Sequence, residues 1–154
     1  MSPRVKIAIV GKYNPEVKVF FYGSFINRQV LAKGGLVPER VEVARLLGFD
    51  IHIETLATLV RSDRHCVYGI VCEASQAELR RLYGQEWLDG AYRPEAVLVE
   101  TDRGALIPAL CYIATTPPPA RPANDYLDWI TRPAREYGFP DWYLQRLESF
   151  RKKQ

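Results

Sequence analysis

The feature that most restricts the fold of this chain is a run of strand-like segments that follow one another without helices between them. Residues 39–44, 49–54, 55–60 and 66–73 carry the alternation or the β-branched and aromatic content of strands. Two more, 92–100 and 105–114, flank the turn Asp102-Arg103-Gly104 and form a predicted hairpin. Consecutive strands do not build a doubly wound sheet. We therefore predict an α+β protein whose mixed sheet curls into a small β-barrel.

Helical segments interrupt and follow these strands, and we expect them to flank the barrel. After expected strands at 5–10 and 17–22, residues 25–33 suit a short helix that ends at Gly34-Gly35. Ser75 and Glu78 have the spacing of a capping box, which predicts a helix start. Asn124 is the expected cap of a later helix that ends at Gly138, and Pro140 begins the last one.

The composition predicts one globular domain over residues 1–154. A net charge of +3 gives no electrostatic basis for binding nucleic acid, and no apolar run reaches the roughly 18 residues that cross a bilayer. The three cysteines, Cys66, Cys72 and Cys111, lie in strand-like runs without the spacing of metal ligands. We expect buried free thiols, a cytoplasmic setting, and neither a metal nor a cofactor. No pattern indicates the oligomeric state.

The segment Tyr22-Gly23-Ser24-Phe25 links an apolar strand to the first expected helix. A helix start presents unpaired backbone N–H groups, and Gly23 allows a ligand to approach the backbone closely. The Ser24 hydroxyl is available either to a ligand or to the helix as a cap. Taken alone, this segment is either a small anion-binding site or an ordinary strand–turn–helix connection.

Glu86 is the second candidate functional residue. It follows the helix that begins near Ser75, and Leu82, Tyr83, Trp87 and Leu88 surround it in sequence. Aromatic neighbours predict a poorly hydrated carboxylate, which would be a stronger base than an exposed one. On local sequence alone, an ordinary surface carboxylate at a helix end is the alternative.

In order along the chain, these segments resemble the γ-glutamylcyclotransferase-like family. The resemblance covers nearly all of the sequence. It rests on Tyr22-Gly23-Ser24, the strand 67–71, the stretch 82–86 followed by Tyr92, the prolines 117–119 with Tyr126, and the stretch 134–140. Many members of the family have Asn directly after Tyr-Gly-Ser. Here Phe25 takes that place, and the sequence leaves open whether Asn27 takes the role of that Asn.

The resemblance implies a small mixed barrel, a γ-glutamyl substrate and a set of site residues. Tyr22, Gly23, Ser24 and Phe25 would hold the amino-acid end of the substrate, Tyr126 would contact it, and Glu86 would be the general acid/base. The reaction would release 5-oxoproline and a free amine, as a transferase or lyase with no metal or cofactor. The leaving amine is open: glutathione, a γ-glutamyl amino acid, an isopeptide and a natural-product intermediate all fit.

The chemistry explains why so few groups are needed. The α-amine of the substrate attacks its own γ-carbonyl, so the protein supplies no nucleophile. That amine has a pKa near 7.8 and must lose its proton before it can attack. The pKa of an exposed glutamate is about 4.3, so transfer of the proton to such a carboxylate costs about 4.8 kcal/mol. Two alternatives stay open: a non-catalytic module of the same fold that binds a small ligand or a protein, and an amide hydrolase that uses water.

Overall fold

The computed structural model of the protein describes residues 15–114 and 122–151. The strand expected at 5–10 and most of the proline-rich loop lie outside these residues. In chain order the elements are β1 (Glu16–Phe21), η1 (Ser24–Ile26), α2 (Arg28–Lys33), β2 (Glu42–Ile53), β3 (Ala57–Ser75), α3 (Gln76–Tyr83), η2 (Glu86–Leu88), β4 (Tyr92–Thr101), β5 (Leu106–Ala114), α4 (Asn124–Glu136) and α5 (Asp141–Glu148).

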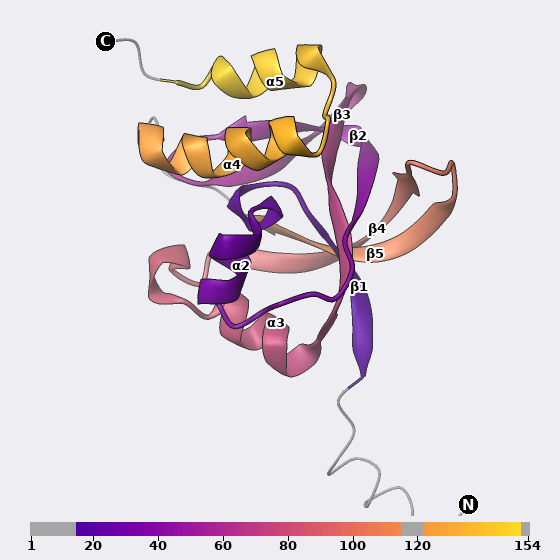
Figure 1. Ribbon diagram of the computed structural model, residues 1–154, viewed down its shortest axis with the longest axis vertical. Coiled ribbons are helices and arrows are strands. Elements are labelled where there is room, and N and C mark those ends of the chain that lie inside the picture. Colours follow the sequence, from indigo (N-terminus) through magenta and orange to yellow (C-terminus); the bar gives the residue numbers. More distant parts are fainter. Residues whose placement is uncertain (1–14, 115–121, 152–154) are drawn as a thin grey trace, which may run out of the picture.

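The strands close into a barrel in the order β1-β3-β2-β4-β5, which confirms the predicted architecture. β1 is antiparallel to β3 and parallel to β5, where Val19 pairs with Leu110 and Phe20 with Cys111. The sheet is therefore mixed. Figure 1 shows α2 and α3 on one side of the barrel, α4 and α5 packed together beside the long β2–β3 arm, and the β4–β5 hairpin extending away from these helices.

The β2–β3 arm is longer and more continuous than the sequence pattern predicts. Gly48 adopts φ +88°, a left-handed conformation that suits glycine, and joins two expected strands into one. The register shifts at this point, because Leu47 pairs with Cys66 whereas Phe49 pairs with Arg61. Residues 62–65 have no partner on β2, so the loop expected at 62–64 is a bulge inside β3.

The pairing of β1 with β3 contributes the most deeply buried part of the core. Val19, Phe20 and Phe21 are almost fully buried, and Gly69 on β3 lets the two strands approach each other. A Cβ atom at position 69 would lie 2.1 Å from the Phe21 carbonyl oxygen. Gly69 is therefore a position where the backbones of β1 and β3 approach each other too closely for any side chain.

The helix caps match the sequence at some positions and differ at others. Ser75 and Glu78 form the predicted capping box of α3. The helix expected over residues 25–33 is instead split at Asn27, whose side chain accepts hydrogen bonds from the N–H groups of Gln29 and Val30 and so caps α2. Asn124 is not a cap, because α4 begins with Ala123 in that position. Gly138 ends the α4 region at φ +77°, as predicted.

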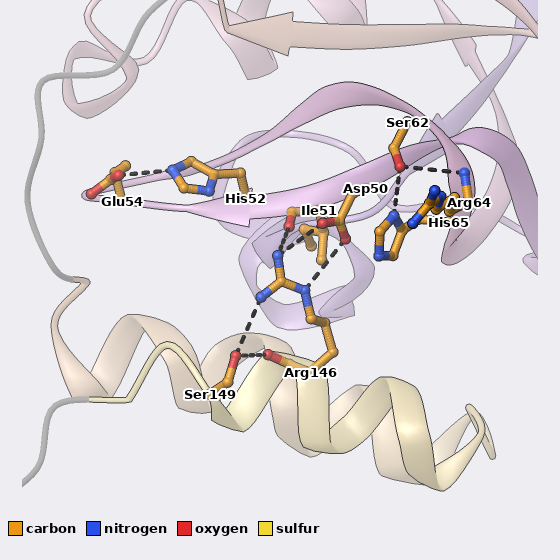
Figure 2. A network of polar contacts seen from close by, with 9 residues as sticks. All are labelled: Asp50, Ile51, His52, Glu54, Ser62, Arg64, His65, Arg146 and Ser149. Atoms are coloured by element: carbon orange, nitrogen blue, oxygen red, sulfur yellow. Dashed lines mark hydrogen bonds and ion pairs between the residues drawn. The ribbon is translucent and has the colours of Figure 1, made fainter.

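An ion pair fixes α5 to the β2–β3 arm. Figure 2 shows Arg146 extending from α5 to Asp50 and to the Ile51 carbonyl oxygen on β2. The Arg146 Nη2–Asp50 Oδ2 distance is 2.9 Å, and the guanidinium also lies over the Phe150 ring at 4.5 Å. This contact orients the C-terminal helix pair relative to the barrel.

Candidate active site

A small cavity lies where the Tyr-Gly-Ser turn meets the barrel wall and α4. Its volume is about 20 Å³, room for about one water molecule. It is lined by Phe21, Tyr22, Gly23, Ser24, Phe25, Ala57, Tyr83, Leu88, Tyr92, Tyr112 and Tyr126. The cavity thus contains all four residues of the predicted turn together with Tyr126, although more than a hundred positions separate the two segments.

The turn is held in place on both sides. The Tyr22 hydroxyl donates to the Tyr112 carbonyl oxygen at 2.6 Å, and Ser24 is buried. Gly23 is required by space, because a Cβ atom there would lie 2.9 Å from the Ala57 Cβ. Among the described residues, the N–H groups of Gly23, Ser24 and Phe25 have no acceptor. Donors of this kind beside a cavity suit a carboxylate or an oxyanion.

Ala57, the first residue of β3, is clamped by two tyrosines. Its N–H donates to the Tyr126 hydroxyl at 2.9 Å, and its carbonyl oxygen accepts from the Tyr92 hydroxyl. Both backbone groups of one buried residue are therefore satisfied by side chains from α4 and β4. The clamp fixes the distance between the barrel and α4, and with it the width of the cavity.

Aromatic rings close the opposite wall. Tyr83 stacks on Tyr112 with ring centroids 3.9 Å apart and an interplanar angle of 13°. Phe25 packs edge-to-face on Tyr83 at 5.3 Å and on Trp87 at 6.0 Å. Sequence reasoning missed Tyr92 and Tyr112 as wall residues, since a tyrosine within a strand is equally typical of a core. Only the register of the predicted hairpin could have indicated a shared face, because Tyr92 pairs with Ala114 and Tyr112 with Pro94, which makes the two tyrosines diagonal neighbours.

The lining carries no charge. It contains no Asp, Glu, Lys, Arg or His, and burial raises the pKa of Tyr22, Tyr83 and Tyr92 well above the usual value of a phenol. Burial also raises the pKa of Tyr126, although hydrogen bonds with the Ala57 N–H and with Ser24 partly offset the effect. The site therefore offers neutral hydroxyl groups, backbone amides and aromatic faces.

Glu86 does not have the environment that its sequence neighbours predicted. It is the first residue of η2, and its side chain is exposed and absent from the cavity lining. Leu88, two positions later, is buried in the cavity wall instead. In a turn with three residues per repeat, residues two apart point in different directions. The predicted poor hydration of Glu86 is wrong for this conformation, while its catalytic role stays a prediction.

Asn27 lies outside the cavity lining as well. Its side-chain oxygen caps α2, and its Nδ2 donates to the Trp129 carbonyl oxygen at 3.1 Å. The Asn27 side chain thus connects α2 to α4 beside the site. Its hydrogen bonds stabilise the structure, and it does not contact the cavity.

The described residues contain no group of three or more His, Cys, Asp or Glu that could hold a metal ion. Nor does any helix among them combine the length and the apolar character of a membrane span.

Cys72 and Cys111 are buried, as expected, whereas Cys66 is only partly buried. His65 bonds to the Ser62 hydroxyl in the β3 bulge (Figure 2), and His52 bonds to Glu54.

Comparison with known proteins places this architecture in a family. The model of the AIG2-like family matches residues 66–147, more than half of the sequence. The chain belongs to the AIG2-like family. No curated protein matches the sequence of this AIG2-like chain.

Solved structures share its fold. A structure described as gamma-glutamyl cyclotransferase superposes with a TM-score of 0.75 at 24% identity, covering 91% of this chain and 90% of that one. An uncharacterized human protein gives 0.76 at 24% identity, with 90% of each chain covered. A yeast gamma-glutamyl cyclotransferase specific to glutathione gives 0.63 at 13% identity, covering 89% and 96%. At these identities the likeness establishes the fold of this AIG2-like protein.

Proposed function

We propose that this AIG2-like protein is a γ-glutamylcyclotransferase that releases 5-oxoproline from a small γ-glutamyl compound. One observation carries the proposal: the Tyr-Gly-Ser turn and Tyr126 meet around one buried cavity, on a fold shared with γ-glutamyl cyclotransferases. The proposed role of Tyr22, Gly23, Ser24 and Phe25 is to hold the amino-acid end of the substrate.

The reaction balances within the substrate. The lone pair of the α-nitrogen forms a bond to the γ-carbonyl carbon, and the oxygen briefly becomes an oxyanion. Collapse of this intermediate breaks the bond to the leaving nitrogen, which takes up the proton lost by the α-amine. The backbone N–H groups of Gly23, Ser24 and Phe25, which have no acceptor among the described residues, are the proposed donors to the substrate carboxylate or to the oxyanion.

The uncharged lining supports this chemistry in a second way. An ammonium group that leaves water for this uncharged lining while Glu86 still points to solvent loses hydration, and its pKa falls. A free α-amine normally has a pKa of about 7.7–8.0, so even a modest decrease makes it neutral near pH 7. The cavity itself therefore favours the nucleophilic form of the substrate.

In the proposed mechanism Glu86 relays the proton once η2 has changed conformation. In the structure Leu88 occupies the cavity wall and Glu86 is exposed. A rotation of the η2 turn that moves Leu88 outward would enlarge the cavity and turn Glu86 toward it. The residues after the turn suit such a hinge, because Asp89 and Gly90 both have positive φ, at 53° and 60°.

The test is 5-oxoproline release from a panel of γ-glutamyl amines and peptides. We expect wild-type turnover of at least one compound and a loss of 10²–10⁴-fold in Glu86→Gln, the range typical of a general acid/base. Glu39→Gln is the matched control, since Glu39 is an exposed carboxylate outside the cavity lining. Equal rates in a folded Glu86→Gln protein would remove Glu86 from the mechanism. Acylating the α-amine of the substrate must stop the reaction, because that amine is the nucleophile of the cyclisation. A hydrolase would still cleave the acylated substrate, since its nucleophile is water.

One observation favours a second candidate function, a non-catalytic module that binds a small carboxylated ligand. The observation is that Glu86 is exposed and absent from the cavity lining, which leaves the lining without an acid or base group. Thermal-shift measurements with 5-oxoproline, glutamate and the same γ-glutamyl panel separate the two functions. Stabilisation by these ligands without turnover of any compound would establish the binding module and overturn the enzyme.

A further inference from the structure

A second and larger cavity lies between the β2–β3 arm and the β4–β5 hairpin. Among the described residues, β2 and β4 pair only through Ala44–Thr101 and Arg45–Glu100, so the arm and the hairpin separate beyond these pairs. The space between them has a volume of about 290 Å³, near the lower limit of ligand-binding pockets. This space, here called the arginine groove, is lined by Phe49, Leu59, Arg61, Arg93, Pro94, Glu95, Ile113 and Ala114.

The arginine groove does not extend the active-site cavity. Tyr92 and Tyr112 line the cavity. Arg93, Glu95 and Ile113 line the groove instead. Successive side chains of a strand point to opposite faces, and Arg93 pairs with Ile113 in the hairpin register. The charged groups that the hairpin contributes to the groove therefore lie on the opposite face from the two tyrosines, and a ligand of the groove is a separate molecule.

Arg93 gives the groove a positive charge that no acidic side chain neutralises. Its Nη1 donates to the carbonyl oxygens of Gly90 and Tyr92, at 2.8 and 3.1 Å. These two backbone contacts hold the guanidinium in place, while its Nε and Nη2 have no acceptor among the described residues. A fixed guanidinium with unused N–H groups suits a carboxylate, which accepts two parallel hydrogen bonds.

Arg61 and Glu95 form an ion pair across the groove, with Nη2 and Oε1 3.0 Å apart. Their side chains are 78% and 44% exposed, and an ion pair in contact with water contributes little to stability. The carboxylate of a ligand can therefore replace Glu95 beside Arg61 at little cost. Two arginines and one glutamate give the lining a net charge of +1, which complements a monoanion better than a phosphate dianion.

The floor of the arginine groove is apolar. Phe49 and Leu59 are 8% and 5% exposed, the Arg61 guanidinium lies over the Phe49 ring at 5.1 Å, and Ile113 is half-buried beside them. We propose that the groove binds a small organic acid with one carboxylate and an apolar body. The carboxylate bonds to Arg61 and Arg93, and the apolar body packs against the floor.

A titration of the isotope-labelled full chain, followed by nuclear magnetic resonance, tests this proposal. The probe is hydrocinnamate, and its neutral amide is the control ligand of the same shape. We expect the acid to shift the backbone N–H signals of Arg61, Arg93 and Ile113, with a dissociation constant of about 1–10 mM, as for other ligands of this size. The amide should bind about tenfold more weakly, because it carries no charge.

Three variants examine the charges of the groove. Arg93→Gln should weaken binding of hydrocinnamate about tenfold. Glu95→Gln should strengthen it about threefold, since it removes the competitor for Arg61 and raises the net charge of the lining. Arg132→Gln is the matched control, because Arg132 is an exposed arginine of α4 outside the groove. Arg93 and Glu95 are exposed as well, so all three variants should keep the circular dichroism spectrum and unfolding midpoint of the wild type.

Four results would each overturn the proposal. The first is that hydrocinnamate shifts no groove signal up to about 50 mM, and the second is that the acid and its amide bind equally. The third is a variant that contradicts the charges, either Arg93→Gln with the affinity of Arg132→Gln or Glu95→Gln without a gain. The fourth is a set of shifts confined to residues 23–25, which would place the acid at the active-site cavity. None of these measurements requires turnover, so the outcome is independent of the proposed γ-glutamylcyclotransferase activity.

Discussion

Replacing Tyr126 by Phe removes a single oxygen atom and keeps the ring. The lost hydroxyl accepts a hydrogen bond from the Ala57 N–H at 2.9 Å. Ala57 is 2% exposed, so no bulk water replaces the missing acceptor. A buried donor left unsatisfied costs about 1–3 kcal/mol of folding free energy. For a chain of this length, 2 kcal/mol lowers the unfolding midpoint by about 4–8 °C.

Tyr112→Phe is the matched control for this change. It removes the same atom from another ring of the cavity wall, but the Tyr112 hydroxyl has no hydrogen-bond partner among the described residues. Urea unfolding followed by circular dichroism gives the free energy of each variant, and thermal unfolding gives the midpoints. The reasoning fails if Tyr126→Phe is within about 0.5 kcal/mol of Tyr112→Phe, since the clamp on Ala57 would then contribute little.

Three further predictions follow from the packing. Gly69→Ala should destabilise the protein by about 3 kcal/mol in urea unfolding, because its Cβ would lie 2.1 Å from the Phe21 carbonyl oxygen; a loss below 1 kcal/mol would contradict this close approach. Asn27→Ala should cost about 1 kcal/mol as a lost helix cap, and Asn27→Asp should restore most of it. Burial raises the pKa of Cys72 and Cys111 to about 12, so both thiols should stay protonated and unreactive to alkylation from pH 7 to 10. Mass spectrometry should find them labelled only after unfolding. Rapid labelling of the native protein would refute their burial.

Local sequence rules predicted the parts of the fold that depend on near neighbours. The Ser75–Glu78 capping box and the turn before Gly104 lie where they were expected, because each is decided within four residues. Gly48 shows the limit of this reasoning. A glycine between two strand patterns is compatible with a break or with a bulge. The choice depends on the partner strand, whose register is set by residues far away in the sequence.

The candidate site was predictable only in part, for a similar reason. The family resemblance indicated the Tyr-Gly-Ser turn and Tyr126, and both line the cavity. The surroundings of Glu86 were inferred from its sequence neighbours, yet the backbone of η2 sends Leu88 inward and leaves Glu86 exposed. Side-chain direction in a short turn is set by backbone torsions that residue types alone do not specify.

The parallel pairing of β1 with β5 has a consequence during synthesis. The ribosome makes β1 first, but its partners Leu110 and Cys111 emerge about ninety residues later. Contacts so distant in sequence form slowly. Until they form, the nascent strand presents an open edge on which other chains can aggregate. Variants that slow barrel closure should therefore reduce the yield of protein in cells more than they reduce the stability of the purified molecule.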